Sequence, residues 1–174
     1  MTRTADPGAD FDALFLAQWP KVVRIAQRVL GPGAMAEDAA QEAFLAFHRR
    51  FGDQLPDRPG PWLYAAATHL ALNALRAEQR RDRRERRDAA TAPAPAPGDP
   101  AAELVEREAR DELRAALSRL RPQSAAILAM RYAGLRYQEV AQALGLPADQ
   151  VGTRLRRAEL ALRKELEHAS SQGR

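Results

Sequence analysis

Several residue types are scarce or missing in this chain of 174 residues, and each absence narrows what it can be. There is no cysteine, so disulfide bonds and thiolate metal sites are excluded. Only ten residues are aromatic, which favours thin, alanine-rich helical bundles over a large β core. No stretch approaches the roughly 20 apolar residues of a membrane span, and residues 1–10 lack the apolar segment of a secretory signal. We therefore expect a soluble, cytoplasmic protein that carries no metal and no other cofactor.

Lysine is also rare, because 25 of the 27 basic residues are arginine. The net charge is +4 and the isoelectric point about 10.1, a modest excess that suits an anionic partner without establishing one. A GC-rich genome is the simplest reason for the arginine bias. The bias nevertheless leaves a surface equipped for bidentate phosphate contacts.

Apolar residues recur at helical spacing along the chain, and no segment shows the strict alternation of a strand, which predicts an all-α protein. One apolar stripe begins at Phe11. A new helix is expected to begin at Pro20 and to end before Gly31, because proline suits a first helical turn and glycine follows a last one. Two further helices are expected, at about 36–51 and 61–87, with a proline- and glycine-containing loop between them.

Residues 88–102 alternate alanine with proline, which denies the backbone both helix continuity and ladder hydrogen bonds. This segment predicts a semi-extended linker between two small helical domains, residues 1–87 and 103–174. We expect that shortening the linker to five residues impairs the function of the whole chain while each domain still binds its own partner.

The segment 137–158 is the most informative part of the chain. A short helix is expected from Tyr137 to Leu144, then a turn at Gly145 and a second helix opened by Pro147. One face of the second helix is an apolar stripe made of Val151, Leu155, Ala158 and Leu162. Another face carries Gln150, Thr153, Arg154 and Arg157. Because arginine binds guanine bidentately and glutamine binds adenine, this arrangement is typical of a helix-turn-helix that reads DNA. A plain solvated surface is the alternative interpretation.

The long helix at 61–87 changes character along its length. Its first half packs inward, whereas residues 76–87 hold seven arginines against three acids. This basic end, which includes Arg76 and Arg80, could follow a phosphate backbone, with Trp62, Tyr64 and His69 upstream as surfaces on which unstacked bases stack. A solvated helix end is the alternative, and a tryptophan that begins a helix is more often a core anchor.

In this order, these segments resemble the bacterial sigma-70 family of RNA polymerase subunits, specifically its small extracytoplasmic-function group. The resemblance runs from about Phe11 to Leu166. It is carried by the acidic helix motif at residues 37–45 (Glu-Asp-Ala-Ala-Gln-Glu-Ala-Phe-Leu), by Trp62-Leu63-Tyr64 with its helical continuation, and by the helix-turn-helix with Arg154-Leu155 and Arg157-Ala158. Each motif alone is weak, and three in order around a linker are specific.

The resemblance implies a role for each motif. Asp38, Gln41 and Glu42 would bind the clamp helices of the polymerase β′ subunit. The loop at 51–61 and the helix from Trp62 would engage the promoter −10 element, where a flipped base of the non-template strand is captured. The helix from Pro147 would enter the major groove of the −35 element, and the C-terminal domain would also touch the β flap. None of these roles requires a catalytic residue, so an enzyme is not expected.

The chain departs from the family pattern at four positions, one of which is Pro147 in place of the usual serine or threonine cap, a change that a first helical turn tolerates. His69 and Asn73 stand where the family often has asparagine and aspartate, which implies a changed −10 preference. Gly152 stands where lysine is common, so one phosphate contact would be absent. These departures leave room for a sigma-like regulator that no longer supports initiation. An anti-sigma partner is a family expectation that the sequence neither supports nor denies.

An interpretation from a different functional class is that the chain is a helical enzyme or a metal-binding protein. It would use Glu37, Asp38, Glu42 and His48, but no Glu-x-x-His pair, His-Glu-x-x-His motif or phosphate-binding loop occurs, and the three histidines are scattered.

Overall fold

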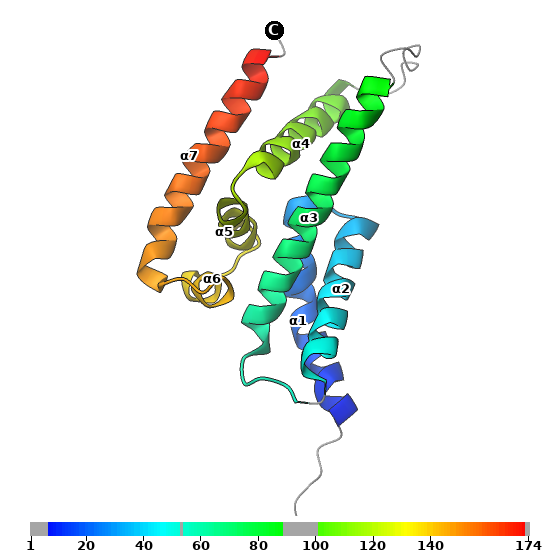
Figure 1. Ribbon diagram of the computed structural model, residues 1–174, viewed down its shortest axis with the longest axis vertical. Coiled ribbons are helices and arrows are strands. Elements are labelled where there is room, and N and C mark those ends of the chain that lie inside the picture. The colour runs from blue at the N-terminus through cyan, green and yellow to red at the C-terminus, as the bar shows by residue number, and fades with distance from the viewer. Residues whose placement is uncertain (1–6, 53, 89–100, 173–174) are drawn as a thin grey trace, which may run out of the picture.

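The computed structural model describes residues 7–52, 54–88 and 101–172, and within these ranges the chain is helical throughout, without a strand. Its helices are α1 (Pro7–Leu30), α2 (Ala34–Phe51), α3 (Pro59–Asp88), α4 (Ala101–Arg119), α5 (Pro122–Tyr132), α6 (Tyr137–Leu144) and α7 (Ala148–Gln172). The all-α prediction is confirmed. In Figure 1, α1, α2 and α3 run side by side, and the short helices α5 and α6 lie between them and α7. No helix in the described ranges is long and apolar enough to span a membrane.

The prediction of a helix break at Pro20 is wrong, since α1 runs through this residue. Proline removes one hydrogen bond to the carbonyl four residues earlier, here that of Leu16, and this usually kinks or ends a helix. Both residues are exposed, so water can hydrate the freed carbonyl. The buried side chains of Leu14 and Val22 lie on either side and keep both halves of α1 on the same core. Burial therefore outweighs the lost hydrogen bond.

Helix α2 packs against α1 and α3 through alanines and phenylalanines. Ala40 and Ala43 are fully buried and allow close approach of the helices. Phe44 lies within 4.8 Å of Phe15 in α1, measured between ring centroids. Phe47 meets Trp62, at the start of α3, edge to face at 5.5 Å. This aromatic contact fixes the position at which α3 begins.

The predicted helix-turn-helix is present with its expected bounds. Helix α6 ends at Gly145, which has the left-handed φ of 63° that glycine adopts without strain. The N–H groups of Gly145 and Leu146 both donate to the carbonyl of Ala141, which closes the end of α6. Helix α7 then begins at Ala148, directly after Pro147. The sequence thus determines both the turn and the start of the second helix.

The N-terminal helices (α1–α3) and the C-terminal helices (α4–α7) share their apolar cores. One buried cluster combines Val22, Phe47 and Leu63 with Ile127 and Val140, and a second combines residues of α1, α2 and α3 with residues of α4, α5 and α7. The predicted linker falls largely on residues 89–100, which lie outside the described residues. The division of the chain at 1–87, 88–102 and 103–174 stays a prediction.

Candidate functional site

The polar face predicted on α7 lies at the surface. Gln150, Thr153 and Arg157 are exposed and Arg154 is partly exposed. On other faces of the same helix Val151 and Ala158 are fully buried, and Leu155 is partly buried against the core. The apolar stripe anchors α7 and places amide, hydroxyl and guanidinium groups at the surface, where they can reach a groove of duplex DNA.

Arg154 is held by two glutamine side chains. Its Nη2 and Nε donate to Oε1 of Gln150, one turn earlier, at 2.9 and 3.3 Å. Its Nη1 donates to Oε1 of Gln123 at 2.8 Å. Gln123 belongs to the first turn of α5, 31 residues away. Sequence reasoning missed Gln123, because no local pattern connects the start of α5 with the face of α7.

Gly152, where the resemblance led us to expect lysine, is partly exposed on α7. A Cβ atom built there would lie 3.4 Å from the ring of Tyr137, at the short end of ordinary van der Waals contact. The position therefore accepts a side chain, and the structure gives no packing reason for glycine.

The acidic motif of α2 faces solvent. Asp38 and Gln41 are exposed, whereas Glu42 is partly exposed and forms an ion pair with Arg49 on the same helix. Ala39, Ala40 and Ala43 are buried on the opposite side of the helix. Helix α2 contacts α1 and α3, and its acidic face stays open in this arrangement.

The −10 candidates on α3 divide into exposed and covered residues. His69 and Asn73 are exposed, and Trp62 is partly exposed against Phe47. Tyr64 is only 4% exposed, and its hydroxyl donates to Oε1 of Gln18 at 2.7 Å. In this conformation Tyr64 offers no face on which a base could stack.

Arg76 is partly exposed and contacts the C-terminal helices. Its Nε and Nη2 donate to the carbonyls of Ser118 and Leu120 at 3.3 and 3.5 Å, which satisfies carbonyls left free where α4 ends. Arg80, one turn later, is exposed and begins the basic end of α3.

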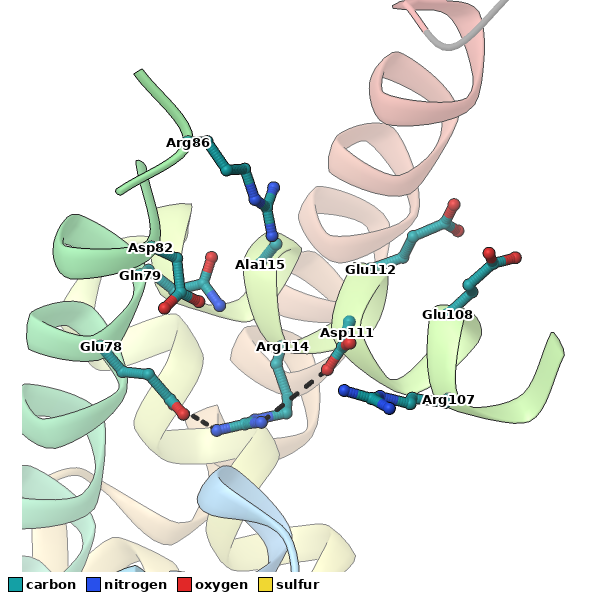
Figure 2. Close-up of a pocket in the computed structure, with 10 residues that line it drawn as sticks. All are labelled: Glu78, Gln79, Asp82, Arg86, Arg107, Glu108, Asp111, Glu112, Arg114 and Ala115. Carbon is teal, nitrogen blue, oxygen red and sulfur yellow. Dashed lines mark hydrogen bonds and ion pairs between the residues drawn. The ribbon is translucent and has the colours of Figure 1, made fainter. Parts of the chain in front are cut away.

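A charged pocket of about 630 Å³ separates the end of α3 from α4. Figure 2 shows Arg114 of α4 between two carboxylates, Glu78 of α3 and Asp111 of its own helix. Glu108 and Glu112 add acids from α4, and Arg86 extends from α3. Side chains of opposite charge therefore attract α3 and α4 to each other across this pocket. Among the described residues no group of His, Asp and Glu is arranged to hold a metal ion.

An ion pair joins the two halves of the chain near Tyr64. The Nζ of Lys21 in α1 donates to Oε1 of Glu139 in α6 at 2.8 Å and lies 5.3 Å from the centre of the Tyr64 ring. Oε2 of Glu139 also accepts from the backbone N–H of Arg136 at 2.8 Å. Burial raises the pKa of Glu139, but the hydrogen bonds from Lys21 and Arg136 outweigh it and hold this pKa below 4.5. The hydrogen bond to Glu139 in turn raises the pKa of Lys21 above 10.5.

An apolar groove of about 330 Å³ lies among residues of α1, α4, α5 and α7. It is lined by Leu113, Leu117, Leu128, Ala129, Tyr132 and Leu162, with Arg28 and Arg114 at its edge. Leu113 and Tyr132 are 44% and 60% exposed, and because both line the groove they add exposed apolar surface to it. The groove is therefore a candidate protein contact.

Two family models match the chain in the order that the motifs predicted. Sigma-70 region 2 matches residues 14–81, which include the acidic face of α2 and most of α3. Sigma-70, region 4 matches residues 110–162, which include the helix-turn-helix.

Relatives share this organisation. The ECF RNA polymerase sigma factor SigE of Mycolicibacterium smegmatis is 32% identical over 175 residues, covering 97% of this chain and 67% of SigE. The RNA polymerase sigma factor CarQ of Myxococcus xanthus is 32% identical over 169 residues, covering 95% of each.

Solved structures share the fold. CnrH in complex with the cytosolic domain of CnrY matches with a TM-score of 0.55 at 21% identity, over 91% of this chain and 88% of that one. RpoE in complex with the anti-sigma factor NepR from Bartonella quintana matches with a TM-score of 0.50 at 20% identity, over 91% and 97%. The chain belongs to the sigma-70 family, in its extracytoplasmic-function group, and so binds RNA polymerase and directs transcription initiation at promoters.

Proposed function

We propose that α7 reads the −35 element of the promoter through Gln150, Thr153, Arg154 and Arg157. The observation that carries this proposal is the amphipathic placement of α7, with its apolar stripe packed inward and the four polar side chains at or near the surface. Helix-turn-helix proteins insert such a face into the major groove, where arginine, glutamine and threonine meet base edges and phosphates.

The −10 element is proposed to bind along α3 and the preceding loop. Exposed His69 and Asn73 would set the base preference, Trp62 would support a captured base, and Arg80 would begin the contact with the phosphate backbone. Opening the duplex needs no catalytic group, because stacking and backbone contacts to single strands offset the few kcal/mol of unstacking per base step. The proposed role is therefore not enzymatic.

Tyr64 and Arg76 can join the −10 contact only after the C-terminal helices move away. In the closed form, by which we mean the arrangement with the C-terminal helices packed on α3, Tyr64 is buried beside α6. Arg76 is hydrogen-bonded to the end of α4 in the same arrangement. We propose that the chain opens between α3 and α4–α6 when it takes up its place on polymerase and DNA.

Two surfaces are proposed for polymerase. The acidic face of α2, with Asp38, Gln41 and Glu42, suits the clamp helices of the β′ subunit if the facing surface there is basic. The apolar groove beside Leu113 and Tyr132 is proposed to bind the β flap. Both roles place the protein in the cytoplasm with the transcription machinery.

An anti-sigma protein is proposed as a further partner that competes with polymerase. The support is by similarity, since RpoE was solved with the anti-sigma factor NepR and CnrH with the cytosolic domain of CnrY. A purified anti-sigma protein should lower transcription by this chain and be displaced by excess core polymerase. If transcription is unchanged at a saturating concentration of the candidate protein, that protein is not an anti-sigma partner of this chain.

The proposal is tested by transcription with purified core polymerase from a library of randomised promoters. We expect transcripts that depend on this chain and share two upstream elements. Asp38→Lys should reduce polymerase binding and transcription at least tenfold while binding of the −35 duplex is unchanged. Loss of duplex binding in that variant would contradict the division of roles. Duplex binding by the wild type without any transcription would instead favour a regulator that has lost initiation.

A further inference from the structure

The strongest unassigned feature of the DNA-reading surface is the side chain of Gln123. This residue lies in the first turn of α5, outside the helix-turn-helix, and is exposed. Its Oε1 accepts a hydrogen bond from Nη1 of Arg154 at 2.8 Å. The contact connects two helices at the surface that faces DNA in the proposed function.

The hydrogen bonds of Arg154 leave a defined set of donors free. A guanidinium group carries five N–H groups, one on Nε and two on each terminal nitrogen. Gln150 accepts from Nε and Nη2, and Gln123 accepts from Nη1. One N–H therefore remains on each terminal nitrogen, which is the number that a bidentate contact with O6 and N7 of guanine requires.

The same geometry changes the role expected of Gln150. A bidentate contact with adenine needs both the amide oxygen and the amide nitrogen of a glutamine. The Oε1 of Gln150 already accepts from Nε and Nη2 of Arg154. Gln150 therefore acts first as a support for Arg154 and is not available as an independent reader of adenine while this contact lasts.

We propose that Gln123 is a positioning residue that fixes the base choice of Arg154 in the −35 element. The side chain of Arg154 has four rotatable bonds. Gln150, on the same helix, restrains one edge of the guanidinium group by accepting hydrogen bonds from Nε and Nη2. The hydrogen bond from Nη1 to Gln123 restrains the other terminal nitrogen from a second helix. A guanidinium held from two helices presents its free N–H groups in one orientation, and preorganised donors discriminate between bases better than mobile ones. This inference rests on the proposed reading of the −35 element by α7.

The test uses the full chain with core polymerase on promoters that carry each of the four bases at every −35 position. Arg154→Ala should abolish the preference for guanine at one position, a loss of about 10- to 100-fold. Gln123→Ala should lower the preference at that same position by about three- to tenfold and leave the other positions unchanged. In the Arg154→Ala background, Gln123→Ala should have no further effect on base preference.

Two further variants separate positioning from general effects. Gln123→Glu keeps an acceptor for Nη1, so it should retain the guanine preference while its negative charge weakens binding to all promoters equally. Gln138→Ala removes a glutamine that is likewise exposed, on α6, and should leave the preference intact. The melting temperatures of the Gln123 and Gln138 variants should match that of the wild type, since both glutamines are exposed.

The outcomes distinguish this inference from the proposed function. If the wild type shows no −35 preference at all, the reading of DNA by α7 is wrong. If Arg154→Ala leaves the wild-type preference intact, Arg154 does not read a base, and both this inference and the proposed role of Arg154 fail. If Arg154→Ala removes the preference but Gln123→Ala leaves it intact, or if Gln123→Glu loses it as fully as Gln123→Ala, the positioning role is overturned and the proposed function stands.

Discussion

Lys21→Met tests whether the two halves of the chain are held closed by a polar contact as well as by apolar burial. The substitution removes the ammonium group that donates to Glu139 at 2.8 Å and keeps an unbranched apolar stem. The side chains of Lys21 and Glu139 are 36% and 16% exposed, so the pair lies between a surface ion pair and a buried one. We expect the closed form to lose about 1–2 kcal/mol, from the values typical of exposed pairs and of hydrogen bonds to charged groups.

This loss should raise the ratio of open to closed molecules by about 5- to 30-fold. Because the chain has no cysteine, cysteines introduced at exposed Met35 and Ser170 can carry a donor and an acceptor dye without interference. Energy transfer between them reports the distance from α2 to the end of α7. Lys164→Met is the matched control, since Lys164 is the other lysine of the chain and is exposed on α7. Equal energy transfer in the wild type and Lys21→Met, at denaturant concentrations that open only part of the wild-type molecules, would refute the reasoning.

Acidic pH should also open the closed form of the wild type, because it weakens the same ion pair between Lys21 and Glu139. The pKa of Glu139 is lowered in the closed form, so its contribution is present above about pH 4.5 and is lost as the pH falls through the lowered value. Lys21 has a raised pKa, and its contribution is lost only as the pH rises above 10.5. Lys21→Met should therefore reduce the change in energy transfer as the pH falls below about 4.5. An identical acid transition in both proteins would exclude the pair as its cause.

Three other substitutions address separate parts of the structure. Gly152→Lys should strengthen binding to all −35 duplexes and steepen the slope of log affinity against log salt by about 0.9, whereas an unchanged slope would exclude the added phosphate contact. Phe47→Ala should cost about 3–5 kcal/mol in urea unfolding, because Phe47 is fully buried and supports Trp62; a loss below 1 kcal/mol would contradict that packing. Gly60→Ala places a Cβ 2.9 Å from the Tyr64 hydroxyl, so it should displace that ring and lower the melting temperature, and an unchanged melting temperature would show that the ring moves freely.

The sequence predicted what depends on short-range chemistry. Gly145 and Pro147 determine a turn and a helix start, and the periodicity of α7 separates its apolar stripe from its polar face. The predicted break at Pro20 failed because the burial of Leu14 and Val22 depends on helices far away in the chain. The sequence around Pro20 shows which helical hydrogen bond the proline removes. It does not show the packing energy from distant helices that compensates for this loss.

The contacts between the two halves could not be predicted from periodicity. Tyr64 looked like a stacking surface, yet its neighbours Gln18 and Lys21 come from α1, and Glu139 approaches from α6. Gln123 escaped notice for the same reason, since its partner Arg154 lies 31 residues away. One signal was available: the six apolar residues 125–130 predict a helical segment buried on all sides, and these six residues of α5 are all buried.

The composition of α5 bears on how readily the closed form can come apart. This helix lies between the N-terminal helices and α7, and its buried residues include Ala125, Ala126 and Ala129. Alanine exposes little apolar area when such an interface separates, and the free energy of exposure grows with that area at roughly 25 cal/mol per Å². Leucine or phenylalanine at these three alanine positions would bury more apolar area and raise the free energy needed to separate the two halves. The three alanines therefore lower the free energy that a partner must supply to separate α5 from its neighbours, whereas Ile127, Leu128 and Met130 contribute the larger apolar areas that hold the helix in place.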